Sequence, residues 1–199
     1  MNELFAPAGQ LTLQADMPVT PEALYEQTLV VRSQIGDEAA FQELLKLYGP
    51  RLLLFIQRMM QSSPEQNADE AQETWIAIYR ALPRLLDASK FRPWAFRIAR
   101  DRIYREYRRR RLPVQPMAEG AIENVSETAE LDPGLDREEL LQCLDSISPE
   151  HREALVPRFF EEMSYEEIAR VTDSSVGTIR SRIHYGKQAL KKIWEGKAL

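Results

Sequence analysis

Arginine side chains crowd into one stretch of the chain, residues 97–111, which holds eight arginines against only two acids, Asp101 and Glu106. Guanidinium groups pair with the phosphates of nucleic acids. Aromatic residues such as Tyr104 and Tyr107 lie between the arginines, and flat rings beside a cationic groove are a common way to hold single-stranded bases. Most of these rings are expected to pack in the core, and a minority to meet a base. The stretch therefore predicts a surface for nucleic acid.

A second group of polar and basic side chains lies near the C-terminus, in residues 164–190. Ser164 followed three residues later by Glu167 predicts a capping box that starts a helix. The turn-forming run at 172–175 interrupts this helix, and a basic helix restarts at Val176. A short helix, a tight turn and a basic second helix are typical of a helix-turn-helix that enters the DNA major groove. A plain helical hairpin with a solvated basic face is the alternative.

Helices must position both groups, because apolar residues recur at helical spacing through most of the chain. The spacing and the capping residues predict helices over 21–35, 37–60, 64–86, 91–111, 135–147, 149–163, 164–172 and 176–193. On the fourth helix, we expect the protein core to be faced by Trp94, Ile98 and Ala99. Gly49 followed by Pro50 predicts a kink in the second helix, and Pro157 a bend in the sixth. We expect an all-α protein of two small helical domains.

The domain boundaries follow from shifts in composition. Residues 1–20 lack periodicity and predict a mobile tail, which leaves a first domain over 21–111. Residues 112–134 are rich in Pro, Glu and Gly and predict a flexible acidic linker, before a second domain over 135–199. Since this linker has little apolar content with which to fasten the domains, we expect them to be separable.

Composition restricts the class of protein. The chain of 199 residues is 44% hydrophobic and carries a formal net charge of -5, but local patches steer binding more than the sum does. No apolar run approaches the length of a membrane span, so membrane insertion is not expected. The single cysteine, Cys143, excludes an internal disulfide framework, and the N-terminus lacks the pattern of a secretory signal. A cytoplasmic protein is expected.

Catalytic and cofactor sites are not expected. His151 and His184 are far apart in sequence, and neither a phosphate-cradling glycine loop nor a histidine-cysteine metal pattern occurs. Asp69 and Glu73 stand one helical turn apart, but no histidine or third acid lies nearby to complete a metal site. We therefore predict no enzyme activity, no cofactor and no metal.

The motif EIARVTDSSVGTIRSR closely resembles the helix-turn-helix with which bacterial sigma factors read the minus-35 promoter element, especially in the extracytoplasmic-function (ECF) group. The family usually has glycine at the turn where this chain has Asp173, and Asp tolerates the left-handed conformation better than most residues. The resemblance implies a set of residues near minus-35 DNA: Ser174, Ser175, Thr178, Arg180, Ser181, Arg182 and Lys187. Arg180 and Arg182 lie about 200 degrees apart around a helix, so only one can point straight into the groove.

The segment DEAQETWIAIYRA resembles the part of sigma factors that docks on the clamp helices of RNA polymerase. The residues to which the resemblance gives this role are Asp69, Gln72, Glu73 and Trp75.

The segment FRPWAFRIAR resembles the minus-ten region of the same family. The implied DNA-binding residues are Lys90, Arg92, Arg97, Arg100, Asp101, Arg105 and Arg108. Asp101 replaces the usual asparagine, and a carboxylate repels phosphate but can accept from a cytosine amino group.

Two family-like blocks around an acidic linker identify the chain as resembling an ECF-type sigma factor. The implied function is to bring core RNA polymerase to promoters through their minus-ten and minus-35 elements. Core polymerase and promoter DNA are the implied partners, and the resemblance leaves open an anti-sigma factor. The alternatives are a helix-turn-helix regulator that binds duplex DNA without acting as a sigma subunit, an enzyme acting on nucleic acid, and an anti-sigma or scaffold protein.

Overall fold

The computed structural model describes residues 20–109 and 142–197, and every regular element among them is a helix. This confirms the predicted all-α class. The predicted tail, except Thr20, and the whole predicted linker, 112–134, lie outside the described residues, as do Arg110 and Arg111 at the end of the basic stretch.

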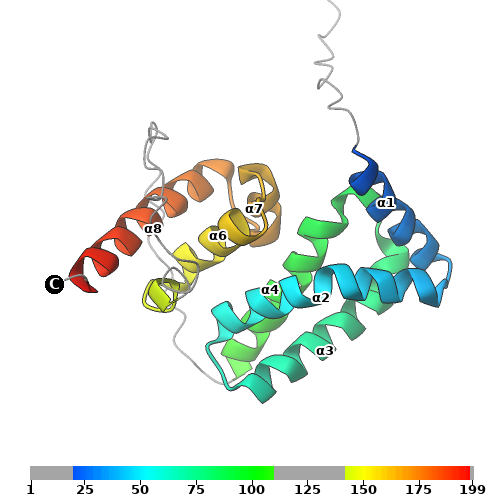
Figure 1. Ribbon diagram of the computed structural model, residues 1–199, viewed down its shortest axis with the longest axis horizontal. Coiled ribbons are helices and arrows are strands. Elements are labelled where there is room, and N and C mark those ends of the chain that lie inside the picture. The colour runs from blue at the N-terminus through cyan, green and yellow to red at the C-terminus, as the bar shows by residue number, and fades with distance from the viewer. Residues whose placement is uncertain (1–19, 110–141, 198–199) are drawn as a thin grey trace, which may run out of the picture.

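The first domain contains four α-helices and two short 3-10 turns (Figure 1). Their bounds are α1 Pro21–Gln34, α2 Glu38–Met60, α3 Pro64–Ala81, η1 Leu82–Arg84, η2 Ala88–Lys90 and α4 Phe91–Arg109. The side chains of Thr20, Asp37 and Ser63 accept hydrogen bonds from backbone amides at the starts of α1, α2 and α3. These caps explain why the predicted helix starts agree with the structure.

Large apolar side chains from α2, α3 and α4 fill the core of the first domain. Phe55 and Phe96 are fully buried and meet edge to face, with ring centroids 5.4 Å apart. The predicted core face of α4 is confirmed, because Ala99 is buried in the core and the half-buried Trp94 and Ile98 pack against it. The third helix also ends earlier than predicted, at Ala81.

The second domain contains α6 (Pro149–Phe160), α7 (Tyr165–Thr172) and α8 (Val176–Lys197), preceded by helical residues 142–144. Ser148 caps α6 by accepting from the His151 amide, as the sequence predicted. Pro157 lies inside α6. The earlier part of the helix predicted over 135–147 lies outside the described residues.

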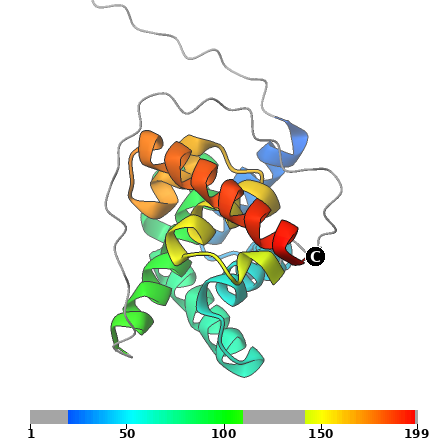
Figure 2. The same ribbon diagram turned by 90° about the vertical axis from the view of Figure 1, so that its left-hand side faces the viewer.

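The two domains are docked against each other: α4 packs against α7, and α2 packs against α6 (Figures 1 and 2). The linker composition gave no reason to expect this contact. Side chains of the helices themselves make this contact, so the composition of the linker does not indicate it. No helix in the described ranges has the length and apolar character needed to cross a bilayer.

Candidate nucleic-acid interface

The predicted capping box is present at the start of α7. The Ser164 Oγ accepts from the Glu167 amide at 3.1 Å, and the Ser164 amide donates to Glu167 Oε2 at 2.8 Å. The reciprocal bonds satisfy two amides that would otherwise lack partners at a helix start. They fix the first helix of the helix-turn-helix.

Asp173 forms the turn between α7 and α8 in the left-handed conformation, with φ at 54° and ψ at 44°. Its amide donates to the carbonyl of Ala169, which closes the end of α7. Asp visits this region at less cost than most side chains do. The expectation that Asp173 preserves the turn is confirmed.

The second helix, α8, packs one face into the domain core and exposes another. Ile179 and Ile183 are buried, whereas Arg180 is exposed. Ser175 starts the helix, since its Oγ accepts from the Thr178 amide at 3.0 Å. Arg180 is therefore free to meet a ligand that approaches this helix.

Two predicted minus-35 residues are turned toward the protein. Ser181 is 8% exposed and its hydroxyl donates to the Gly177 carbonyl of its own helix. Arg182 donates from Nη1 to Glu153 Oε1 at 2.8 Å, and its side chain is only 17% exposed. The packing of α8 on α6 places both side chains on the inner part of the helix surface. Ser181 is thus not presented to a ligand, contrary to the expectation.

The other predicted minus-35 residues lie near the turn or farther along α8. Ser175 is exposed, Ser174 and Thr178 are half-buried, and Ser174 Oγ lies 3.4 Å from Arg182 Nη1. Lys187 is half-buried, with its amine 5.7 Å from the centre of the Phe159 ring.

Three of the predicted minus-ten arginines on α4 point toward the second domain. Arg92 Nη2 lies 2.7 Å from Glu167 Oε1, and Arg100 Nε lies 3.0 Å from Glu153 Oε2. Arg97 makes a longer contact, 3.6 Å, with Asp173. The expectation that these arginines are available to phosphates is wrong for Arg92 and Arg100 in this arrangement, because acids of the second domain already pair with them.

Glu153 is the most enclosed carboxylate of this surface, with a side chain 1% exposed. It accepts from Arg100, from Arg182 and from the Tyr104 hydroxyl at 2.9 Å. Burial alone would lower the pKa of Arg100, but the charge of Glu153 and its hydrogen bond raise that pKa overall. Burial, together with the Glu153 charge, raises the pKa of Tyr104. Arg100 therefore stays charged and Tyr104 keeps its phenolic proton. The cluster holds two cations, Arg100 and Arg182, around the Glu153 carboxylate.

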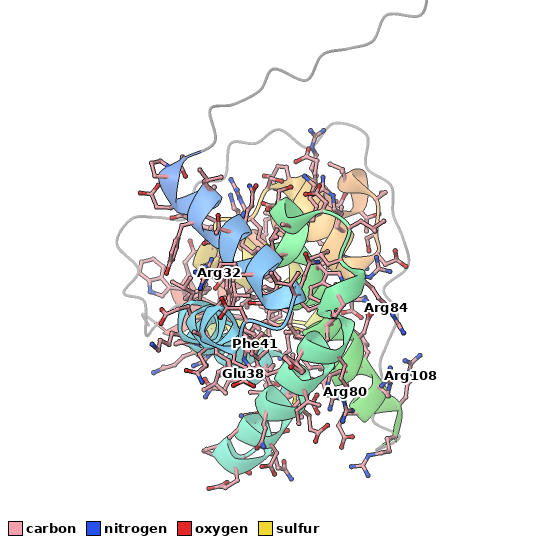
Figure 3. All side chains as sticks on the ribbon, turned by 90° about the vertical axis from the view of Figure 1, so that its right-hand side faces the viewer. Arg32, Glu38, Phe41, Arg80, Arg84 and Arg108 are labelled. Carbon is pink, nitrogen blue, oxygen red and sulfur yellow. The ribbon has the colours of Figure 1, made fainter. Side chains whose placement is uncertain are left out.

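The remaining minus-ten residues are open to solvent. Lys90, Arg105 and Arg108 are exposed and form no ion pair with the described residues, and Arg108 projects from the last turn of α4 (Figure 3). Asp101 is also exposed, with contacts of 3.5 Å to Arg100 and 4.0 Å to Arg97.

The predicted polymerase-binding residues divide by burial. Asp69, Gln72 and Glu73 are exposed on α3. Trp75 is only 8% exposed and packs edge to face against Phe41, with ring centroids 5.8 Å apart. A partner cannot reach the Trp75 ring directly, so we correct its role to packing that supports α3.

The acids and the arginine that build the domain contact were not predicted from the sequence. Glu153 and Glu161 are buried, and the buried Arg152 donates to the carbonyls of Leu144, Ile147 and Arg58. Their positions beside apolar residues of α6 were the only available signal. In the described parts of both domains, no group of three or more His, Cys, Asp or Glu side chains could hold a metal ion.

Comparison with known families gives two matches in the order of the two domains. Residues 44–112 match the model of sigma-70 region 2, and residues 137–190 match the model of sigma-70 region 4. The ECF RNA polymerase sigma-E factor of Escherichia coli is 32% identical over 181 residues, covering 85% of this chain and 94% of that protein. The RNA polymerase sigma-H factor of Pseudomonas aeruginosa is 33% identical over 179 residues, covering 84% and 92%.

Solved structures share the fold. CnrH in complex with the cytosolic domain of CnrY has a TM-score of 0.63 at 22% identity, covering 86% of this chain and 98% of that one. The sigma factor RpoE of Bartonella quintana, in complex with the anti-sigma factor NepR, has a TM-score of 0.61 at 24% identity, covering 78% and 96%.

Proposed function

This chain belongs to the ECF group of the sigma-70 family and is an RNA polymerase sigma factor, and we propose how its surfaces divide that work. As a sigma factor it binds core RNA polymerase and directs initiation at promoters with minus-ten and minus-35 elements. The first domain, 21–111, holds the polymerase and the minus-ten element. The second domain, 135–199, reads the minus-35 element, and residues 112–134 connect the two.

The polymerase-binding role is assigned to Asp69, Gln72 and Glu73. All three are exposed on α3, and their helical spacing groups them on one side. Glu73 makes only a 3.5 Å contact with Arg102 from a side chain that is 58% exposed. Exposed acids and amides without a strong partner are suited to a basic or polar surface on another protein.

The minus-ten role is assigned to the arginines of α4. Arg105 and Arg108 are open to solvent, while Arg92 and Arg100 must leave their acidic partners before they meet phosphate. The minus-35 role is assigned to α8, with Arg180 as the exposed arginine nearest the turn. One observation supports this division between polymerase-binding and DNA-binding surfaces: the same chain presents an acidic and amide face on α3 and basic faces on α4 and α8.

A protein partner that restrains the chain is also part of the proposal. CnrH and RpoE were each solved with a protein bound, CnrY and the anti-sigma factor NepR, respectively. By analogy we assign this chain an anti-sigma factor as a partner. We assign it no reaction of its own and place it in the cytoplasm, where core polymerase works.

The test is to assemble the full chain with core RNA polymerase and map the starts of the transcripts made from genomic DNA. We expect a stable complex and a defined set of start sites that share minus-ten and minus-35 sequences. A chain that binds promoter duplexes alone but neither binds core polymerase nor starts transcription would support a conventional helix-turn-helix regulator instead.

A further inference from the structure

The last residue of α1 is joined to the loop that leads into α4. Gln34 donates from Nε2 to the Leu82 carbonyl at 3.0 Å and to the Leu85 carbonyl at 2.7 Å. A side-chain amide has two N–H donors, so both are used here. The bonds cross 48 and 51 residues of sequence. They fasten the segment between α3 and α4 to α1, a helix to which neither polymerase nor DNA contacts are assigned.

The tip of this loop has little apolar packing of its own. Leu86 is fully exposed, although the preceding Leu85 packs partly against the core. Burial of apolar side chains stabilises a loop without giving it a direction, whereas a hydrogen bond weakens steeply when its angle or length changes. The amide of Gln34 is therefore the contact that fixes the path of the backbone at residues 82–85.

A second set of hydrogen bonds continues from the loop to Lys90. The Asp87 carboxylate accepts from the Ser89 amide at 2.9 Å and from the Ser89 hydroxyl at 2.6 Å, and the Lys90 amide donates to the Asp87 carbonyl at 3.0 Å. The turn η2, which ends at Lys90, packs against α1, and the start of α4 lies beside that helix (Figure 1). The backbone of Lys90 is thus held in a fixed place relative to Gln34.

We propose that Gln34 is a positioning residue for the minus-ten contact of Lys90. Gln34 meets no DNA itself and acts by holding the loop that carries Lys90. This role rests on the proposed function, in which the first domain holds the minus-ten element, and it adds α1 to the parts of the chain that promoter binding needs. A lysine amine attracts phosphate as a point charge, so a displaced backbone weakens the contact directly.

The test uses holoenzyme assembled from the full chain and core polymerase, with a promoter from the mapped transcription starts as the probe. Gln34→Glu keeps the shape of the side chain but replaces the donor nitrogen with an acceptor oxygen. Gln27→Glu is the matched control and adds the same charge to the same helix. Gln27 lies seven residues earlier on the same face of α1, is also half-buried, and forms no hydrogen bond with the described residues.

The salt dependence of promoter binding separates a positioning role from a loss of folded protein. Each lost phosphate contact reduces the slope of log affinity against log salt by about 0.9, so the drop in affinity between about 50 and 200 mM salt becomes about threefold smaller. We expect this change in Lys90→Ala and, to at most the same extent, in Gln34→Glu. Gln27→Glu should match the parent chain. A substitution that only unfolds part of the sample lowers affinity by one factor at every salt concentration.

A double variant shows whether Gln34 acts through Lys90. Gln34→Glu combined with Lys90→Ala should bind the promoter as Lys90→Ala alone does, because the contact that Gln34 positions is already lost. Gln34→Ala, compared with Gln27→Ala, adds no charge. This second pair keeps the test decisive if circular dichroism shows that Gln34→Glu does not fold.

Three results would overturn the positioning role of Gln34. They are Gln34 variants with the same salt slope as the Gln27 variants, effects of Gln34→Glu and Lys90→Ala that simply add, and a Lys90→Ala variant that binds the promoter as the parent chain does. The parent holoenzyme still forms and binds its promoter in each of these cases. A parent chain that forms no holoenzyme would instead overturn the proposed function and this role with it.

Discussion

Arg92 and Glu167 join α4 to the first helix of the helix-turn-helix, with Arg92 Nη2 at 2.7 Å and 2.8 Å from the two carboxylate oxygens. The same Glu167 carboxylate accepts from the Ser164 amide at 2.8 Å. One side chain therefore both caps α7 and holds the domains together. Substitutions at these positions can separate the two roles.

We predict that Ser164→Ala lowers the free energy of unfolding of the second domain by about 0.5–2 kcal/mol, the usual cost of losing a helix cap. Glu167→Gln keeps a side-chain oxygen that can accept from the Ser164 amide, and so should cost less than Glu167→Ala. Denaturant titrations followed by circular dichroism measure all three. Equal losses for Glu167→Gln and Glu167→Ala would mean that charge, rather than the capping oxygen, sets the stability of α7.

Gly186 lies where α8 crosses α6 and leaves no room for a side chain. An added Cβ would come within 2.7 Å of Leu155 Cδ1 and 3.2 Å of His151 Cβ. Overpacking costs about 1–3 kcal/mol, while replacing glycine in a helix recovers about 1 kcal/mol at most. Gly186→Ala should therefore destabilise the protein.

Gly196→Ala is the matched control, since Gly196 lies in the last turn of the same helix, α8, and a Cβ there meets nothing within 4 Å. It should leave the stability unchanged or raise it by up to about 1 kcal/mol. A melting temperature that falls for Gly186→Ala but not for Gly196→Ala supports this account. A rise for Gly186→Ala would show that α8 can shift away from α6 at little cost.

His151 should make the second domain less stable in mild acid. Burial lowers the pKa of His151 below 6.5, and the charge of Arg182 adds to this against the opposing charge of Glu150. As the pH falls, His151 therefore binds a proton in the unfolded chain before it does so in the folded protein. The contribution of neutral His151 to the free energy of unfolding is fully present above pH 6.5 and is lost as the pH drops toward the lower pKa of the folded state.

Unfolding free energies measured at about pH 7.5 and about pH 5.5 test this, because the histidine charge changes in that interval. The parent chain should lose more stability between the two conditions than His151→Gln does. The buried Nε2 of His151 has no hydrogen-bond partner among the described residues, which agrees with a neutral ring. An equal loss in both proteins would assign the acid sensitivity to other groups.

The role proposed for the exposed face of α3 predicts weaker polymerase binding without a folding defect. Replacing Asp69, Gln72 and Glu73 together with alanine should weaken binding to core polymerase and leave the helical signal intact, since all three are exposed. The matched control is the triple alanine variant of Glu22, Glu38 and Gln42, which removes the same charges from exposed positions of α1 and α2. Competition against a reference sigma factor gives the affinity. Equal effects of the two triple variants would remove the specific role of the α3 face.

Local chemistry explains which parts of the structure could be predicted. Ser164 and Glu167 interact with backbone only three residues away, and the conformational tolerance of Asp173 is a property of its own side chain. Helix starts, the turn and the all-α class follow from such short-range rules. Trp75 shows the limit, because its burial depends on Phe41 in another helix.

The direction of each arginine could not be predicted for the same reason. Arg100 and Glu153 are 53 residues apart, and neither belongs to a periodic pattern that would indicate the other. A basic stretch in the sequence indicates a cationic surface but not which cations are already paired. The docking of the domains depends on these distant pairs, so it became visible only in three dimensions.

The two arginines of α8 now have different surroundings, which sharpens the question of which one reads a base. Arg180 is exposed near the turn, whereas Arg182 is held by Glu153. We predict that Arg180→Ala costs about 1–3 kcal/mol and relaxes preference at one minus-35 base pair, as expected for loss of a bidentate contact with guanine. Arg182→Ala should instead weaken binding evenly across sequences and reduce the salt slope by about one unit, as expected for loss of a phosphate contact.

Promoter binding by the holoenzyme, measured across a minus-35 library and a salt series, distinguishes these roles. Lys192→Ala is the control, since Lys192 is exposed near the far end of α8. Altered base preference in Arg182→Ala with uniform weakening in Arg180→Ala would reverse the assignment. An unchanged profile in both variants would place α8 outside the DNA contact.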